Sequence, residues 1–190
     1  TFVFVDEAFI ELSDPKESVA EFAVTNDFVV VLRSLTKTYA VPGLRIGFAV
    51  ASRDFANILN NIRIPWSLNS VAGAVGEHLL KGHGGYIKIT LDLVKKERHW
   101  LSSNLGAIRG LKLHPSDTNF ILVDISDFFI SSSDLTQRML RQGIIIRDCS
   151  SFGLKDHVRV AVRKRQDNKK LIKALSSIIS EWGKELAEKE

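Results

Sequence analysis

The segment that runs from residue 30 to residue 48 constrains the fold of this chain more than any other. It opens with the apolar run Val30-Val31-Leu32, continues into hydroxyl side chains and a lysine, crosses the turn Pro42-Gly43 and ends in a second short apolar run. This pattern predicts a buried strand, a polar loop and a returning strand. Ligands of open α/β sheets bind at the ends of such strands. A lysine in an ordinary surface loop is the alternative interpretation. The polar side chains that we expect to meet one anionic ligand are Ser34, Thr36, Lys37 and Arg45.

The first residues of the chain follow the same plan. The apolar run over residues 2–5 ends in a carboxylate, Asp6. An unpaired buried charge is expensive, so an acid at the end of a buried strand predicts a partner for it. A helix N-cap or a loop-exposed acid is the alternative interpretation.

The composition is that of an ordinary globular protein. Of the 190 residues, 45% are hydrophobic and 25% are charged, which allows one domain or two small ones. No apolar run approaches the roughly 20 residues needed to cross a bilayer, and nothing at the start resembles a signal peptide. We therefore expect a soluble protein with no membrane partner. The single cysteine, Cys149, excludes an internal disulfide and favours a cytoplasmic location.

The charged residues and histidines limit the possible partners. A formal net charge of +4 suits an anionic small molecule. No basic stripe interleaved with aromatic residues occurs, so we expect no nucleic-acid partner. His78, His83 and His99 are scattered without the spacing of metal ligands, so we expect no metal site.

Helices are expected between and after these strands. Asp14-Pro15 predicts the start of a short helix over residues 16–22, and Ser52 and Asn69 are the expected N-caps of two later helices. A longer amphipathic helix is expected over residues 86–105. Ile89, Leu93, Lys96 and Trp100 lie on adjacent turns of this helix and form an amphipathic stripe of helical period.

The remaining sequence has the pattern of a small α/β domain. A helix is expected to begin at Ser133 and to end at Gly143, because these residues suit an N-cap region and a C-terminal glycine. A last helix is expected over residues 167–182. The expected strands cover residues 111–113, 119–123, 144–148 and 157–163.

The motif over residues 34–47 resembles a known signature. Its order of Ser-x-x-Lys, Pro-Gly, Arg and Ile-Gly is similar to the lysine motif of fold-type I pyridoxal-phosphate enzymes in the aminotransferase class I/II family. The resemblance implies that Lys37 holds the aldehyde of pyridoxal 5'-phosphate as a Schiff base. It also implies that Ser34, Thr36 and Arg45 bind the cofactor phosphate.

A second part of the resemblance lies at the first expected strand. Asp6, followed by Glu, Ala and the aromatic Phe9, is similar to the site in this family that binds the pyridine nitrogen of the cofactor. The resemblance implies that Asp6 keeps this nitrogen protonated, which makes the ring an electron sink. Phe9 is a departure, because many aminotransferases carry at this position a tyrosine that contacts the phenolic oxygen of the cofactor.

The resemblance also implies a division of the chain, which opens on a strand similar to the middle of a family member. We expect a fragment that lacks the N-terminal half, and a homodimer when the protein is full length. The expected fold class is α/β, the C-terminal part of a fold-type I enzyme. The expected parts are residues 1–68 of the large cofactor-binding domain, linking helices over residues 69–106, and a small C-terminal α/β domain over residues 107–190.

Arginines on expected strands are the candidates for substrate binding. On sequence alone, an edge strand facing water is the alternative explanation for Arg147, Arg159 and Arg163. The resemblance implies that Arg147 and Arg159 bind substrate anions, for which a bidentate guanidinium is suited. Arg163 replaces a small residue of the aminotransferase branch, and Asn119 matches a substrate-side position.

Within the family, Phe9, the sequence Pro65-Trp66-Ser67 and Arg163 are similar to the threonine-phosphate decarboxylase branch. This resemblance implies decarboxylation of O-phospho-L-threonine to (R)-1-aminopropan-2-yl phosphate for cobalamin biosynthesis, so the expected partner is a small phosphorylated amino acid. The alternatives are a histidinol-phosphate aminotransferase that uses 2-oxoglutarate, and a non-catalytic aminotransferase-like domain.

Overall fold

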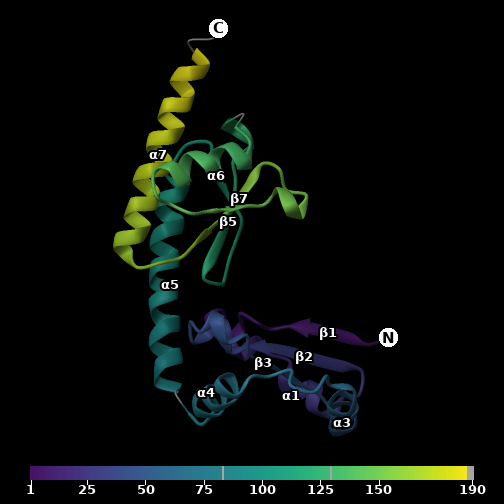
Figure 1. The fold of residues 1–190 in the computed structure, drawn as a ribbon. Coiled ribbons are helices and arrows are strands. Elements are labelled where there is room, and N and C mark those ends of the chain that lie inside the picture. The colour runs from purple at the N-terminus through teal and green to yellow at the C-terminus, as the bar shows by residue number, and fades with distance from the viewer. Residues whose placement is uncertain (83, 129, 188–190) are drawn as a thin grey trace. The chain divides into compact units, whose positions relative to one another are not determined.

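The computed structural model describes residues 1–82, 84–128 and 130–187 (Figure 1). The chain forms two compact units, Thr1–Leu91 and Asp92–Glu190, and the long helix α5 (Gly84–Gly106) contributes residues to both.

The first unit is built on a three-stranded sheet in the order β1-β2-β3. Strand β1 (Val3–Asp6) runs parallel to β2 (Val29–Ser34), and β3 (Gly47–Val50) returns antiparallel to β2. The apolar run at the start of β2 buries Val30 and Val31 almost completely, as the sequence pattern predicts. Because β1 and β2 are parallel, their carboxyl ends lie at the same edge of the sheet.

The helices of the first unit confirm two of the expected N-caps. They are α1 (Ala20–Thr25), α2 (Leu35–Thr38), α3 (Arg53–Ile62), α4 (Ser70–Leu80) and the start of α5. The Oγ atom of Ser52 accepts a hydrogen bond from the backbone N–H of Phe55 at 3.4 Å, and the Oδ1 atom of Asn69 accepts one from Ala72 at 2.8 Å.

The helix expected over residues 16–22 is corrected by the structure. Asp14 caps only a 3₁₀ turn, Pro15–Glu17, and α1 begins later at Ala20. Val19 interrupts the two because its backbone N–H donates to the carboxylate of Glu7 instead of continuing a helix.

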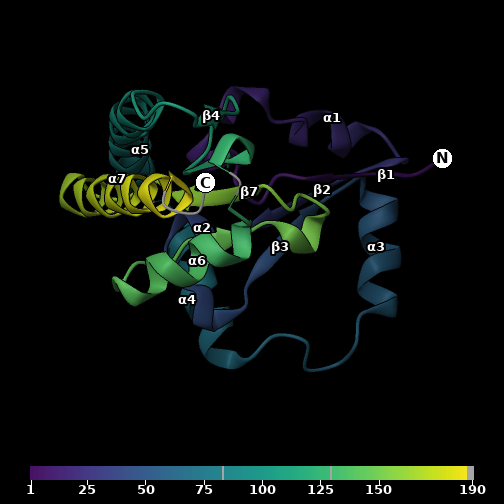
Figure 2. The ribbon, with the colours of Figure 1, turned by 90° about the horizontal axis from the view of Figure 1, so that it is seen from above.

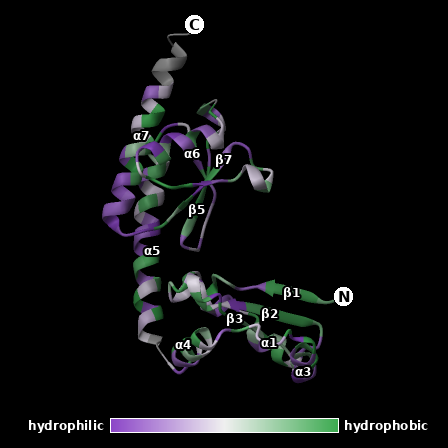
Figure 3. Cartoon of the chain, in the orientation of Figure 1, coloured by the Kyte–Doolittle hydropathy of each residue, from purple (hydrophilic) through white to green (hydrophobic). Residues whose placement is uncertain are grey.

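Much apolar surface of the first unit is exposed. Figure 3 shows β1 and β2 coloured as hydrophobic along much of their length. The large apolar side chains that remain exposed in this unit include Phe2, Phe4, Phe22, Phe28, Ile62, Ile64 and Trp66. Exposed apolar surface of this extent is typical of a binding interface.

The second unit contains a four-stranded antiparallel sheet in the order β4-β5-β7-β6. Its strands are β4 (Lys112–Leu113), β5 (Phe120–Asp124), β6 (Arg147–Asp148) and β7 (His157–Ala161). Alternate residues of the two central strands are buried, namely Ile121, Val123, Val158 and Val160. The opposite face of these strands is left to polar and aromatic side chains.

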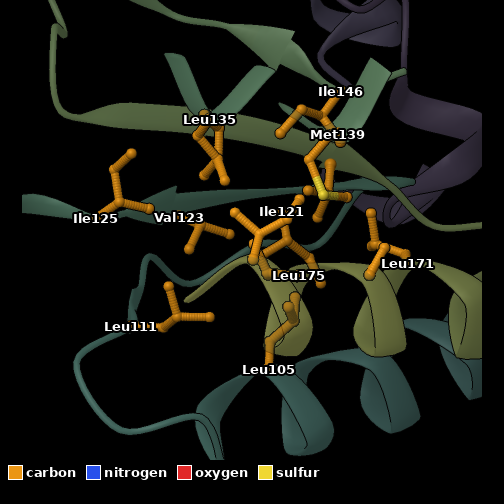
Figure 4. Close-up of a cluster of buried hydrophobic side chains, with 14 of the residues drawn as sticks. Leu105, Leu111, Ile121, Val123, Ile125, Leu135, Met139, Ile146, Leu171 and Leu175 are labelled. Atoms are coloured by element: carbon orange, nitrogen blue, oxygen red, sulfur yellow. The ribbon is translucent and has the colours of Figure 1, made fainter. Parts of the chain in front are cut away.

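Three helices cover the buried face of this sheet. These are the part of α5 in this unit, α6 (Ser132–Arg141) and α7 (Arg165–Ala187), with α5 and α7 side by side in both ribbon views (Figures 1 and 2). Figure 4 shows how the apolar side chains of the sheet and helices point toward one another. The centre of this core includes Leu105, Leu111, Ile121, Val123, Leu135, Met139, Leu171 and Leu175.

The structure corrects three details of the second unit. The N-cap of α6 is Ser131, two residues before the expected start at Ser133. The Oγ atom of Ser131 accepts a hydrogen bond from the N–H of Asp134 at 3.0 Å. The strand expected over residues 144–148 is shortened to β6 (Arg147–Asp148). The buried stripe of α5 contains Val94, Glu97, Leu101 and Leu105, whereas Ile89, Leu93 and Lys96 are exposed and were assigned wrongly.

Candidate active site

Three polar side chains meet where β2 ends and α2 begins. The hydroxyl oxygens of Ser34 and Thr36 lie 2.7 Å apart, and the Nζ atom of Lys37 donates to Thr36 Oγ1 at 3.5 Å. Thr36 is buried, whereas Lys37 is exposed. The Nζ atom of Lys37 lies 5.8 Å from the centre of the Phe9 ring. The turn therefore presents an amine beside two hydroxyl groups and one aromatic face.

Asp6 lies at the same edge of the sheet. It is the last residue of β1 and is paired in parallel register with Leu32 of β2, two residues before Ser34. Its Oδ1 atom accepts a hydrogen bond from the N–H of Ala8 at 2.9 Å, which fixes the side chain in a local turn. Asp6 and the lysine turn therefore lie at the ends of two neighbouring parallel strands.

Arg45 follows on the turn before β3. It adopts a left-handed backbone conformation with φ of 51°, and its guanidinium donates to the carbonyl oxygen of Pro42 at 3.1 Å. The side chain is exposed and is held by its own turn in this structure. Hydroxyl groups and an exposed guanidinium, both of which occur on this segment, are donors of the kind that bind phosphate.

An ion-pair network that the sequence interpretation missed lies beside this turn. The carboxylate of Glu7 is buried and bonded to Arg33, whose guanidinium also pairs with Glu11. Glu7 directly follows Asp6, and Arg33 directly precedes Ser34. The signal available was the position of Arg33 inside a β-branched run, where a charge requires a partner.

Tyr39 completes the surroundings of the lysine turn. Its hydroxyl donates to the carbonyl oxygen of Leu79 at 3.4 Å, and its ring stacks on that of Tyr86 with centres 5.7 Å apart. Burial, followed by the charge of Glu11, raises the pKa of this phenol above its usual range. At neutral pH, Tyr39 is therefore a hydrogen-bond donor and not a base.

Two of the candidate arginines lie together in the second unit. Arg147 of β6 and Arg159 of β7 are direct partners across the two strands, on the sheet face opposite the core. The guanidinium of Arg147 donates to Ser151 Oγ at 2.9 Å. The arrangement places two positive charges side by side on one exposed face.

Arg163 is placed differently from the other two. It lies beyond the end of β7, and its Nε atom is 3.1 Å from the carboxylate of Asp167 in an exposed ion pair. It lines a cavity of about 350 Å³ with Ile145, Asp167 and Lys170. The structure therefore does not show Arg163 joining the pair of Arg147 and Arg159.

Asn119 has an unfilled hydrogen-bonding position. Its Oδ1 atom is buried and has no hydrogen-bond partner among the described residues, while its carbonyl oxygen accepts from Val162 at 2.8 Å. An unsatisfied buried acceptor costs about 1–3 kcal/mol. A donor from a ligand would satisfy it.

A pair of histidines on the same sheet was also missed. The Nε2 atoms of His114 and His157 lie 3.2 Å apart, next to the cross-strand pair formed by His157 and Asp124. Hydrogen bonds from Ser126 hold the pKa of Asp124 below its usual range, and the charge of His157 also lowers it.

In the described ranges, no three His, Cys, Asp or Glu side chains gather as metal ligands would. Nor is any helix in those ranges long and apolar enough to cross a membrane.

An exposed lysine, neighbouring hydroxyls and a carboxylate lie at adjacent strand ends of an α/β sheet, the position at which proteins of the α/β class bind ligands. The family described as aminotransferase class I and II matches residues 1–175. The chain is 33% identical over 178 residues to histidinol-phosphate aminotransferase 2 of Archaeoglobus fulgidus, which covers 93% of this chain and 50% of the relative. The chain therefore belongs to the aminotransferase class I and II family, as its motifs predicted.

Solved structures of this family share the fold. Histidinol-phosphate aminotransferase from Clostridium acetobutylicum superposes with a TM-score of 0.87 at 30% identity, over 95% of this chain and 55% of that one. L-Threonine-O-3-phosphate decarboxylase from Porphyromonas gingivalis gives a TM-score of 0.86 at 25% identity, with the same coverage. The predicted α/β fold of a fold-type I enzyme is thereby confirmed. The chain spans about half the length of the curated relatives it matches.

Proposed function

We propose that the protein is a pyridoxal 5'-phosphate enzyme in which Lys37 holds the cofactor aldehyde as a Schiff base. The observation that carries this proposal is the placement of Lys37 directly after the hydroxyl pair of Ser34 and Thr36, at the sheet edge where β1 delivers Asp6. The donor set of this edge fits a phosphorylated, cationic ring. The family to which the chain belongs supports the same cofactor.

Each residue of this edge has a distinct part in the proposal. Ser34, Thr36 and Arg45 bind the phosphate, because hydroxyls and a guanidinium complement its oxygens. Asp6 keeps a proton on the pyridine nitrogen by pairing with it. Lys37, when its amine is free, moves a proton at the substrate α-carbon.

The bound cofactor supplies an electron sink for the bonds of the substrate α-carbon. Which of these bonds would break depends on how the residues of this chain orient the substrate. Different orientations of the substrate carboxylate would lead to loss of the α-proton or loss of the carboxylate. In the proposal, Arg147 and Arg159 hold the anionic ends of the substrate and so decide the outcome, while the unpaired Oδ1 of Asn119 accepts from a substrate donor.

Decarboxylation of O-phospho-L-threonine is the activity that we propose. It is supported by three departures from the aminotransferase pattern, Phe9, Pro65-Trp66-Ser67 and Arg163. Only Phe9 among these lies against the lysine in the structure, since Trp66 is almost fully exposed and Arg163 pairs with Asp167. The solved decarboxylase that shares the fold supports the same activity.

Histidinol-phosphate aminotransferase activity is the second candidate. It is supported by the name of the relative at 33% identity and by the superposed aminotransferase at 30% identity. Both candidate substrates carry a phosphate, so the same pair of arginines suits either of them. A non-catalytic role is the third candidate, and the intact set of Asp6, Lys37 and Arg45 argues against it.

Two experiments on the full-length gene product test the proposal. Borohydride reduction followed by peptide mapping is expected to find the pyridoxyl group on Lys37, and a label on another lysine, or none, contradicts the cofactor assignment. Incubation with O-phospho-L-threonine is then expected to release carbon dioxide without a keto-acid acceptor. Formation of glutamate from 2-oxoglutarate and histidinol phosphate, with phosphothreonine untouched, rejects decarboxylation and supports the aminotransferase. We also propose that the full-length protein is a homodimer, which sedimentation of the same preparation tests. We propose further that it is located in the cytoplasm.

A further inference from the structure

The strongest unassigned feature of the first unit is a buried network of charges centred on Glu7. The side chain of Glu7 is only 5% exposed. Its carboxylate accepts hydrogen bonds from the N–H of Val19 at 2.7 Å, from Arg33 Nε at 2.8 Å and from Ser18 Oγ at 2.9 Å. A carboxylate with three donors is strongly fixed in place.

The network extends from this anchor to the lysine turn. Arg33 donates to Ser18 Oγ at 2.7 Å and pairs with the carboxylate of Glu11. The other carboxylate oxygen of Glu11 accepts a hydrogen bond from Thr38 Oγ1 at 3.2 Å. Thr38 is 3% exposed and directly follows Lys37 in α2. A chain of bonds therefore connects a fixed, buried carboxylate to the residue next to the lysine.

The lysine turn requires such external support. Helix α2 has only four residues, and the side chain of its N-cap, Ser34, makes no capping bond. A helix of this length is not stable by itself. The chain leaves it through Ala40, which has an unfavourable φ of 53°. The contacts of Lys37 itself are weak, because its bond to Thr36 is 3.5 Å long.

We infer that Thr38 and Glu11 are positioning residues for Lys37, with Arg33 and Glu7 as their anchor. The inference rests on the proposed function, in which Lys37 binds the cofactor aldehyde. None of these four residues touches the reacting atoms in this role. They hold the turn so that the amine meets the aldehyde in a reactive geometry, a requirement for which small displacements matter.

The test separates positioning of the amine from binding of the cofactor. Pyridoxine 5'-phosphate carries an alcohol in place of the aldehyde, so it probes the phosphate and ring contacts but forms no bond with the lysine. In the full-length gene product, Thr38→Val is expected to slow borohydride-trapped labelling of Lys37 by pyridoxal phosphate roughly tenfold. The affinity for pyridoxine 5'-phosphate is expected to change less than about twofold, since the phosphate donors are untouched.

Matched variants complete the design. Thr38→Ser keeps the hydroxyl and is expected to restore the labelling rate, while Glu11→Gln, which weakens the acceptor, is expected to slow it. Thr25→Val removes a hydroxyl that bonds only within α1, from Thr25 Oγ1 to the Phe22 carbonyl at 3.2 Å, and is expected to label at the wild-type rate.

Two results overturn the inference. One is labelling of Thr38→Val and Glu11→Gln at the wild-type rate. The other is a parallel loss of labelling, pyridoxine phosphate affinity and melting temperature, which indicates a purely structural network. If Thr38→Val does not fold, the comparison of Glu11→Gln with Thr38→Ser decides between these outcomes. Failure of the wild-type protein to label Lys37 overturns the proposed function itself. This result differs from failure of the inference because it is seen in the wild-type protein, before any variant is compared.

Discussion

Arg147 and Arg159 are direct cross-strand partners, and each guanidinium lies over an aromatic ring. The guanidinium carbon of Arg147 is 5.3 Å from the centre of the Phe152 ring, and that of Arg159 is 4.7 Å from that of Phe120. Like charges that face each other across two strands repel, and the ring faces offset only part of this repulsion. In the proposed function, an anion bound by both guanidinium groups would remove this repulsion.

Removal of Arg159 tests this anion site. Arg159→Ala is expected to lower kcat/KM for O-phospho-L-threonine. The expected loss of transition-state stabilisation is about 2–5 kcal/mol, because the substrate anion loses its paired guanidinium. Arg163→Ala is expected to have a smaller effect, since the guanidinium of Arg163 is engaged by Asp167. Steady-state kinetics of the full-length gene product measure both values. Equal losses for the two variants contradict the expectation that Arg159 contributes more to substrate binding than Arg163.

The strained residue after the lysine turn offers a stability test. Ala40 has a φ of 53°, where an L-residue other than glycine costs about 1–2 kcal/mol. Ala40→Gly is expected to stabilise the chain by a few tenths to about 1 kcal/mol, after the entropy cost of glycine is subtracted. Ala23→Gly, in the buried interior of α1, is the control and is expected to destabilise by more than about 1 kcal/mol, because the loss of a buried methyl group adds to the helix penalty. Urea unfolding measures both changes in the free energy of unfolding. A loss of stability in Ala40→Gly contradicts the interpretation that the backbone of Ala40 is strained.

A buried carboxylate in the second unit predicts a pH dependence. Glu97 is 4% exposed and accepts two hydrogen bonds from Arg165, at 2.9 and 3.0 Å, and one from Asn168. The bond from Arg165 is the main cause that lowers the pKa of Glu97 from its ordinary value of 4.5. The stability that this carboxylate contributes is therefore present above pH 4.5 and is lost as the pH falls through the lowered pKa of the folded state.

Glu97→Gln checks this assignment. It is expected to cost about 1.5–3 kcal/mol at neutral pH, the range for a charged hydrogen bond, and to flatten the acid limb of the stability curve. The fluorescence of Trp100, on whose ring Arg165 is stacked at 4.4 Å, reports unfolding of this unit. Glu77→Gln, which alters an exposed pair with Lys81, serves as the control and is expected to change stability by less than about 0.5 kcal/mol. An unchanged acid limb in Glu97→Gln is incompatible with the proposed linkage.

The exposed apolar surface of the first unit predicts association of residues 1–190 in isolation. Phe4 and Phe22 are 60% and 56% exposed. Replacement of both by serine is expected to weaken self-association at least about tenfold in sedimentation experiments, because each phenyl ring buried at an interface contributes about 1.5–3 kcal/mol. Phe128→Ser, which alters the packed core of the second unit, is expected instead to lower the melting temperature. A monodisperse wild-type monomer is the contrary result.

Cys149 is expected to resist thiol reagents. It is 1% exposed, and burial raises the pKa of its thiol, although Arg159 and Arg147 oppose this effect. The neutral thiol is therefore the folded form at neutral pH, and it reacts slowly. Its modification rate is expected to follow global unfolding as urea increases. Fast modification without urea shows that the segment opens locally.

The strands and caps could be predicted because their signals are local. The apolar run before Ser34, and the capping residues Ser52 and Asn69, specify structure within a few neighbouring residues. The face of α5 could not be predicted from periodicity alone. Two stripes of similar period exist on this helix, and the second unit buries the one that contains Glu97, whose charge is neutralised by a residue far along the chain.

The site was predictable to the same degree. The motif places Ser34, Thr36 and Lys37 together because they are neighbours in sequence, and parallel pairing adds Asp6. The partnership of Glu11 with Thr38 and the contact of His114 with His157 depend on strand register and on turns between distant segments. No pattern of single residues encodes such distances, so these groups were found only in the structure.

The adjacent acids at the end of β1 have a consequence for the tolerance of this gene to insertions and deletions. Asp6, the last residue of β1, is exposed, while Glu7 is buried in the ion-pair network. Successive residues of an extended chain point to opposite sides. A shift of β1 by one residue would therefore place one carboxylate in the position of the other and fill the vacated position with Val5 or Ala8. We therefore expect single-codon insertions or deletions between Phe2 and Asp6 to be selected against more strongly than the exposure of this strand alone would predict.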